Sequence, residues 1–183
     1  VLSLYLDGET LWLSMASGGI YSYQDGRFET LSKGTSLDST TVFHLTKDQE
    51  GTLWGGFSGG VLKIKEGQLQ VYDMAGIFPK VNIFHVWRDG GDDGLWLTTN
   101  TGLYRVTLSE LEDNQLAEEL HFQSYLKTDG LPSNNVTALS EVCVEENGLW
   151  VPFSGGVVLL DPDQLKSEHY QPEVLIDRVQ ANG

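Results

Sequence analysis

A short motif built around tryptophan recurs four times along the chain, and no other sequence feature limits the fold as strongly. Each copy is an acidic turn containing Gly or Asn that leads directly into a Leu-Trp pair. The first three tryptophans are about 42 residues apart, and the fourth follows a longer segment. Repetition with this period indicates that each copy is one supersecondary unit that must stack on its neighbours. The repeated tryptophans are Trp12, Trp54, Trp96 and Trp150.

A glycine marker follows each of these tryptophans after a few residues. It is Gly-Gly in three copies and a single Gly in the third. A glycine at one fixed place after a strand indicates a turn with positive φ or a close backbone approach. A large flat ring at one fixed place can fill the gap between stacked units. We therefore interpret both markers as structural. The marker glycines are Gly19, Gly60, Gly102 and Gly156.

Each repeat contains four short segments of strand character separated by turn residues. In the second repeat these segments are 42–46, 53–54, 61–64 and 69–72, which are rich in β-branched and other apolar residues. Four short antiparallel strands per repeat form one blade of a β-propeller. The sequence therefore predicts an all-β protein of about four four-stranded antiparallel blades.

The repeat also predicts where the blades begin and end. A capping box that runs from Ser109 to Glu112 predicts a short helix inserted in the third blade. Closing a ring requires the terminal strands to complete one blade, and an open arc exposes a sheet face and edge. We therefore expect these blades to be part of a larger propeller. The predicted blades span approximately residues 1–41, 42–80, 81–135 and 136–171.

Charge and composition exclude some classes of partner. The 183 residues include 26 acidic and 11 basic side chains, for a formal net charge of −15, which would repel a nucleic-acid backbone. We therefore expect no nucleic-acid partner. The sequence has no apolar run of membrane-spanning length, so membrane contact is expected only through parts absent from this chain. The single cysteine, Cys143, alternates with valines and is interpreted as a small buried hydrophobe.

One stretch of the chain resembles a known repeat family. Asp-Gly-Leu-Pro-Ser-Asn-Asn-Val at 129–136 is followed by Glu-Asn-Gly-Leu-Trp-Val at 146–151 and Gly-Gly-Val at 155–157. In order and spacing these residues resemble the two-component regulator propeller repeats of bacterial hybrid sensor kinases and related receptors. The segment 172–183 resembles the first strand of the immunoglobulin-like triple-tyrosine domain that follows such propellers. We assign it as a linker or as that strand.

The resemblance implies a role in signal transduction. Such propellers are periplasmic sensor regions that pass a signal through a membrane helix to a kinase or cyclase. This chain would then be the ligand-sensing, non-catalytic part of a receptor, with its output domain outside the given sequence. The resemblance further implies an oligosaccharide or other small ligand and a homodimeric receptor. No cofactor is expected.

Two histidines are candidate ligand contacts. His44 and His85 occupy matching positions in the innermost strands of adjacent repeats, and innermost strands line the central channel of a propeller. Two neighbouring imidazoles could contact a ligand or simply line the channel. The other repeats have Ser3 and Ala138 at this position, and no third ligand accompanies the pair. We therefore predict no metal site.

Trp87 and Arg88 are the other candidate ligand contacts because they interrupt the repeat. Trp87 lies outside the tryptophan series and close to a Gly-Gly-Asp-Asp turn. An aromatic ring next to a cation suits recognition of a sugar or a peptide. Trp87 could equally close the end of an apolar strand, so both interpretations stay open.

Two other functions stay open from the sequence alone. One is a propeller enzyme such as a lyase or a glycan hydrolase, which needs a cluster of His, acid or metal near the ring axis. Only His44 and His85 approach that arrangement. The other is a scaffold that docks proteins on its blade surfaces. The resemblance to two-component regulator propellers favours the non-enzymatic sensor over both.

Overall fold

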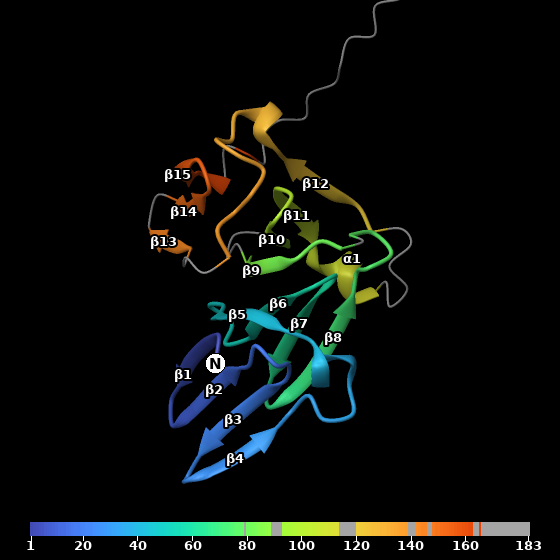
Figure 1. Ribbon diagram of the computed structural model, residues 1–183, viewed down its shortest axis with the longest axis vertical. Helices are drawn as coiled ribbons and strands as arrows, with labels where there is room; N and C mark the ends of the chain where they lie inside the picture. The colour runs from blue at the N-terminus through green and yellow to red at the C-terminus, as the bar shows by residue number, and fades with distance from the viewer. Residues whose placement is uncertain are drawn as a thin grey trace, which may run out of the picture.

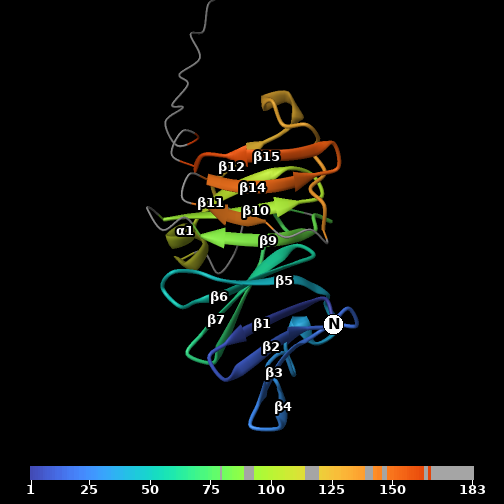
Figure 2. The same cartoon turned by 90° about the vertical axis from the view of Figure 1, so that its left-hand side faces the viewer.

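The computed structural model describes residues 1–78, 80–88, 93–113, 120–138, 142–145, 148–162 and 165. Nearly all regular structure in these residues is β, arranged as four antiparallel sheets that follow one another in chain order (Figure 1; Figure 2). This confirms the predicted fold class, an all-β protein of propeller blades.

The first two sheets each have four strands in sequential order. The first sheet consists of β1 (Ser3–Asp7), β2 (Thr10–Ser14), β3 (Ile20–Gln24) and β4 (Arg27–Thr30). The second consists of β5 (Val42–Lys47), β6 (Leu53–Phe57), β7 (Gly60–Lys65) and β8 (Gln68–Asp73). A 3-10 helix, η1 (Ser36–Ser39), connects these two sheets.

The third sheet keeps the sequential strand order but has a helix inserted before its last strand, and three strands of the fourth sheet are described. The third consists of β9 (Ile83–Arg88), β10 (Gly94–Thr99), β11 (Leu103–Thr107) and β12 (Phe122–Tyr125). Helix α1 (Leu108–Asp113) follows β11, where the capping box predicts it, and the 3-10 helix η2 (Lys127–Asp129) follows β12. The described part of the fourth sheet consists of β13 (Cys143–Glu145), β14 (Gly148–Phe153) and β15 (Gly156–Leu160).

Tight turns determine the register within each sheet. Between β3 and β4, Asp25 and Gly26 have φ of 51° and 78°, the positive pair that a two-residue hairpin turn requires. Gln24 therefore pairs with Arg27, and this register keeps the apolar residues of the two strands on their respective faces of the sheet.

Most of segment 163–183, including the predicted linker, lies outside the described residues.

The two faces of each sheet have different roles. On one face, which we call the tryptophan face, the repeat tryptophan lies opposite a residue of the innermost strand; in the second sheet Trp54 pairs with Thr46. The other face, which we call the leucine face, carries the Leu before that tryptophan, and Leu53 pairs with Lys47. Alternation along a strand keeps these sets apart.

The core lies between sheets, where a tryptophan face packs on the next leucine face. Trp54 of the second sheet shares one buried cluster with Leu95 and Leu97 of the third. Trp96 of the third shares another with Leu149 of the fourth. A separate cluster lies between each pair of neighbouring sheets, because a single sheet cannot bury both of its faces alone. Between the first two sheets, Trp12 and Tyr5 pack against a cluster that includes Leu45 and Leu53.

Cys143 corrects one expectation from the sequence. The alternating pattern predicts a buried side chain, but Cys143 is exposed. It pairs with Trp150 and so lies on the tryptophan face of the fourth sheet, which no other described sheet covers. The pattern identified the strand correctly, whereas burial depends on a neighbouring sheet.

Candidate functional site

The predicted histidine pair forms where the innermost strands of the second and third sheets meet. The ring centroids of His44 and His85 are 4.8 Å apart, with an interplanar angle of 52°. His85 is 2% exposed, and its Nδ1 lies 3.0 Å from Oγ1 of Thr98 on the neighbouring strand β10. Burial, with a further contribution from His44, lowers the pKa of His85 to about 3. His85 is therefore neutral at physiological pH.

The arrangement of His44 and His85 does not resemble a metal site. Among the described residues, no group of three or more His, Cys, Asp and Glu side chains is arranged to hold a metal ion. A neutral imidazole buried against a hydroxyl is a polar contact within the inter-sheet interface. Whether either histidine contacts a ligand stays a prediction.

Trp87 and Arg88 are not brought together by the structure. As consecutive residues of β9 they lie on opposite faces of the sheet. The Trp87 ring lies 6.5 Å from that of Trp96 and packs against the cluster between the third and fourth sheets. Arg88 points to the second sheet, where its Nη1 lies 2.6 Å from a carboxylate oxygen of Glu50. A shared ligand contact by these two side chains stays a prediction.

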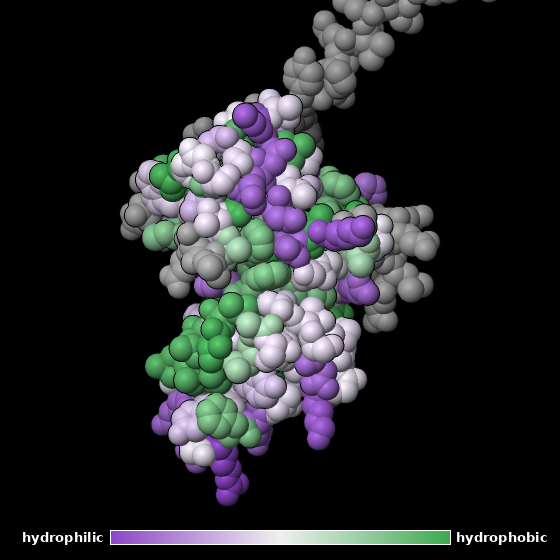
Figure 3. All heavy atoms as spheres, viewed as in Figure 1, coloured by the Kyte–Doolittle hydropathy of each residue, from purple (hydrophilic) through white to green (hydrophobic). Residues whose placement is uncertain are grey.

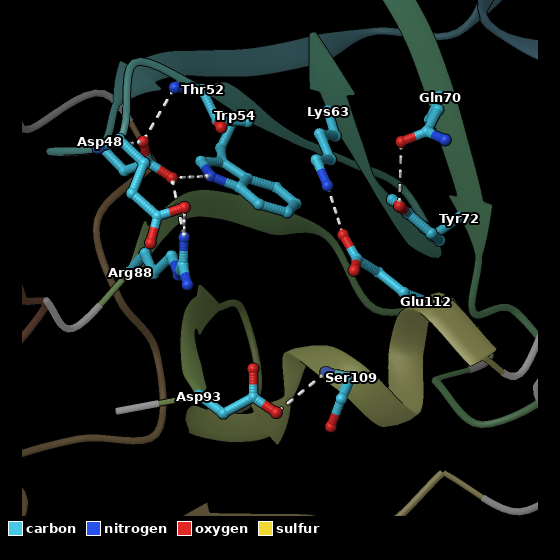
Figure 4. Close-up of polar contacts among 11 residues, drawn as sticks. Asp48, Thr52, Trp54, Lys63, Gln70, Tyr72, Arg88, Asp93, Ser109 and Glu112 are labelled. Carbon is cyan, nitrogen blue, oxygen red and sulfur yellow. Dashed lines mark hydrogen bonds and ion pairs between the residues drawn. The ribbon is translucent and has the colours of Figure 1, made fainter. Parts of the chain in front are cut away.

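Asp48 organises the turn that Arg88 reaches (Figure 4). Its Oδ1 accepts hydrogen bonds from the backbone N–H groups of Glu50 and Thr52, at 3.0 and 2.8 Å. Its Oδ2 accepts one from the indole N–H of Trp54 at 2.8 Å and lies 3.7 Å from Nη1 of Arg88. The acidic residue of the repeat motif thus fixes its own turn, orients the tryptophan and attracts a cation from the next sheet.

The same kind of contact recurs between the first two sheets. Nζ of Lys47 lies 2.5 Å from Oδ1 of Asp7. Lys47 and Arg88 occupy equivalent positions, since each lies opposite the Leu that precedes the repeat tryptophan. A cation at this position therefore joins a sheet to the carboxylate of the preceding one, in addition to the apolar contacts.

A groove of about 530 Å³ lies between the second sheet and α1. Tyr72 contributes an aromatic ring, and burial and the nearby Glu112 carboxylate raise the pKa of its hydroxyl. Lys63 forms an ion pair with Glu112 across the groove and lies over the Trp54 ring at 5.6 Å (Figure 4). The groove is lined by Lys63, Gln70, Val71, Tyr72, Asp73, Leu111 and Glu112.

The groove combines an aromatic ring with several hydrogen-bonding groups. Within the groove, the amide oxygen of Gln70 accepts a hydrogen bond from the Tyr72 hydroxyl at 3.3 Å. Asp73 adds a carboxylate to the lining. Such a lining can bind a polar, uncharged molecule through ring contact and hydrogen bonds. Sequence reasoning did not identify this groove, because it depends on α1 folding back against a sheet about 40 residues earlier. The sequence signal was the capping box alone.

Stacked antiparallel sheets, each with one tryptophan face and one leucine face, define the blades of a β-propeller. No known family profile matches the sequence. The chain is 29% identical over 97 residues to histidine kinase P4 of Formosa agariphila, a match that covers 53% of this chain and 6% of that protein. The chain therefore spans only a small fraction of this relative.

Solved structures agree with this class of fold. The extracellular domain of a hybrid two-component system from B. thetaiotaomicron matches 89% of this chain with 23% identity and a TM-score of 0.63. The extracellular domain of a one-component system from the same organism matches 90% of this chain, with 18% identity and a TM-score of 0.64. This chain covers 21% and 25% of those two chains. No helix among the described residues is both long and apolar enough to cross a bilayer.

Proposed function

We propose that this chain is a ligand-sensing segment from the periplasmic region of a bacterial two-component receptor, and that it has no catalytic activity of its own. The observation that carries the proposal is the 29% identity to a histidine kinase, because that match extends beyond fold to sequence. The likeness to extracellular receptor domains adds support from architecture. Signal output would then come from a kinase or cyclase in another part of a homodimeric receptor.

The groove beside α1 is the proposed ligand site. It joins elements of two different sheets, since Lys63 and Tyr72 belong to the second sheet and Glu112 follows the third strand of the third sheet. A ligand that contacts both sides favours one relative position of the two sheets, which is the property a sensor needs. With a net charge of −15, the chain favours an uncharged ligand such as an oligosaccharide over an anion.

Calorimetric titration of the chain with a panel of neutral oligosaccharides tests this function. We expect saturable binding of at least one compound, weakened roughly fivefold or more by Gln70→Ala, which removes a groove amide. Gln68→Ala is the matched control, because Gln68 lies two residues away on the same face of β8 and outside the groove. Equal weakening by both variants would reject the groove, and no binding across the panel would favour the docking scaffold. Cleavage of a bound oligosaccharide would favour the enzyme.

A further inference from the structure

The side chains that the second sheet contributes to the groove have counterparts at the equivalent places in the third sheet. In the second sheet, β7 has a cation opposite the repeat tryptophan, and β8 has a glutamine opposite that cation and a tyrosine two residues later. The pairing of β10, β11 and β12 puts the same kinds of side chain in the same order. The groove set is Lys63, Gln70 and Tyr72, beside Trp54. Its counterpart, which we call the β12 set, is Arg105, Gln123 and Tyr125, beside Trp96.

The contacts within the two sets also match. In the β12 set the Tyr125 hydroxyl donates a hydrogen bond to the amide oxygen of Gln123 at 3.3 Å, the same length as the tyrosine–glutamine bond in the groove. The guanidinium carbon of Arg105 lies 5.9 Å from the centroid of the Trp96 ring, and the groove lysine lies over its own tryptophan at 5.6 Å. The two sets therefore share their geometry as well as their residue types.

A blade forms without this set of side chains. In the first sheet, Ser22 lies opposite Trp12, and Glu29 lies opposite Ser22. In the fourth sheet, Leu159 lies opposite Trp150. Since these two sheets fold with other residues at the same places, the packing of a blade does not require the cation, the glutamine and the tyrosine together. A binding chemistry shared by the second and third sheets explains why the combination occurs twice.

The β12 set is accessible to a ligand. Gln123 is exposed, Arg105 and Tyr125 are half-buried, and the Trp96 ring beside them is 1% exposed. The Tyr125 hydroxyl also lies 3.4 Å from the backbone oxygen of Leu165. In Figure 3, hydrophilic residues gather in the area around β12 on the side of the molecule in view. An amide, a hydroxyl and a guanidinium that converge beside aromatic rings are suited to a ligand rich in hydroxyl groups.

We propose that Arg105, Gln123 and Tyr125 form a second binding site, which takes the same class of neutral oligosaccharide as the groove. This inference rests on the proposed function, because it assigns the ligand class of the groove to the third sheet. The groove has further lining from α1 and from Asp73, whereas Leu126 follows the tyrosine of the β12 set. With fewer hydrogen-bonding groups, the second site should bind the oligosaccharide more weakly than the groove.

An NMR titration of the whole chain tests the second site, because backbone amides of β8 and β12 report on the two sites separately. The probes are cellohexaose, xylohexaose, mannohexaose and maltohexaose, each added alone to the isotope-labelled chain. With at least one of them, we expect the signals of both strands to shift and saturate. Gln123→Ala should raise the midpoint of the β12 shifts at least about fivefold and leave the β8 midpoint unchanged. Gln70→Ala should have the opposite effect.

Ser124→Ala is the matched control for the second site. Ser124 is exposed on the same strand, but its side chain lies on the opposite face of the sheet, so both midpoints should stay unchanged. Equal weakening by Ser124→Ala and Gln123→Ala would overturn the second site. A β12 midpoint that follows Gln70→Ala would also overturn it, since the β12 shifts would then be relayed from the groove.

The two strands also separate failure of this inference from failure of the proposed function. Shifts in β8 alone would overturn the second site and leave the groove in place. Shifts in β12 alone would reject the groove and support the second site. If no probe shifts either strand, both proposals are wrong. The amide spectrum of each variant, recorded before ligand is added, verifies that the variant folds.

Discussion

Burial of His85 beside His44 makes the interface between the second and third sheets sensitive to acid. The folded pKa of His85 is about 3, whereas a histidine in the unfolded chain titrates near 6.5. Between these values the unfolded chain binds more protons than the folded one, so stability falls as the pH drops below about 6.5. Above that pH this contribution is fully present.

We expect His85→Gln to reduce the acid sensitivity of folding. Lowering the pH from 7 to 5 should cost the unmodified chain about 2 kcal/mol through His85, a loss that the variant lacks. Urea unfolding of both chains at several pH values measures it, and the difference between them removes the contribution of carboxylates. A difference that stays constant with pH would show that His85 does not titrate in this way.

Asp48 is the second residue whose loss should affect stability strongly. Asp48→Ala leaves the indole N–H of Trp54 and two turn amides without their acceptor and removes a carboxylate near Arg88. We expect a loss of about 2–4 kcal/mol in the free energy of unfolding. Asp113→Ala is the control, because Asp113 is an exposed carboxylate at the end of α1. Equal effects of the two substitutions would contradict the role given to Asp48.

At the scale of the element, close contact between β6 and β9 depends on a glycine. A Cβ atom added to Gly56 would overlap the backbone carbonyl of Ile83 in the next sheet. Because backbone cannot move aside as a flexible side chain can, we expect Gly56→Ala to destabilise the chain by about 2–3 kcal/mol. Gly76→Ala meets no atom within 4 Å and should change stability by less than about 0.5 kcal/mol. Thermal unfolding of the two variants compares them, and a harmless Gly56→Ala would show that the sheets can separate.

At the scale of the whole molecule, stability should be distributed sheet by sheet. Each sheet packs mainly on its neighbours in chain order, so damage at one end should not spread to the other. Leu37→Ala removes a fully buried side chain from the cluster between the first and second sheets. We expect faster amide hydrogen exchange in β1–β4 and unchanged exchange in β9–β11. Uniformly faster exchange would instead indicate one cooperative unit.

Much of the fold could be predicted from the sequence because its determinants are local. The repeat period predicted blades, alternation predicted strands, and Asp25-Gly26 predicted a hairpin turn, since each depends on residues close together in the chain. The capping box likewise predicted a helix where α1 forms. The same locality explains why the sequence identified His44 and His85 as equivalent positions.

The tertiary structure alone decided which neighbouring element each sheet face contacts. Trp87 and Arg88 are neighbours in sequence, yet strand alternation sends them to different interfaces. The groove exists only because α1 folds against β8, and Cys143 is exposed only because no described sheet covers its face. Such contacts join residues that are far apart in the chain, and the packing of whole sheets determines them. The sequence by itself therefore determined the blades, and their stacking decided which side chains are buried and where the groove lies.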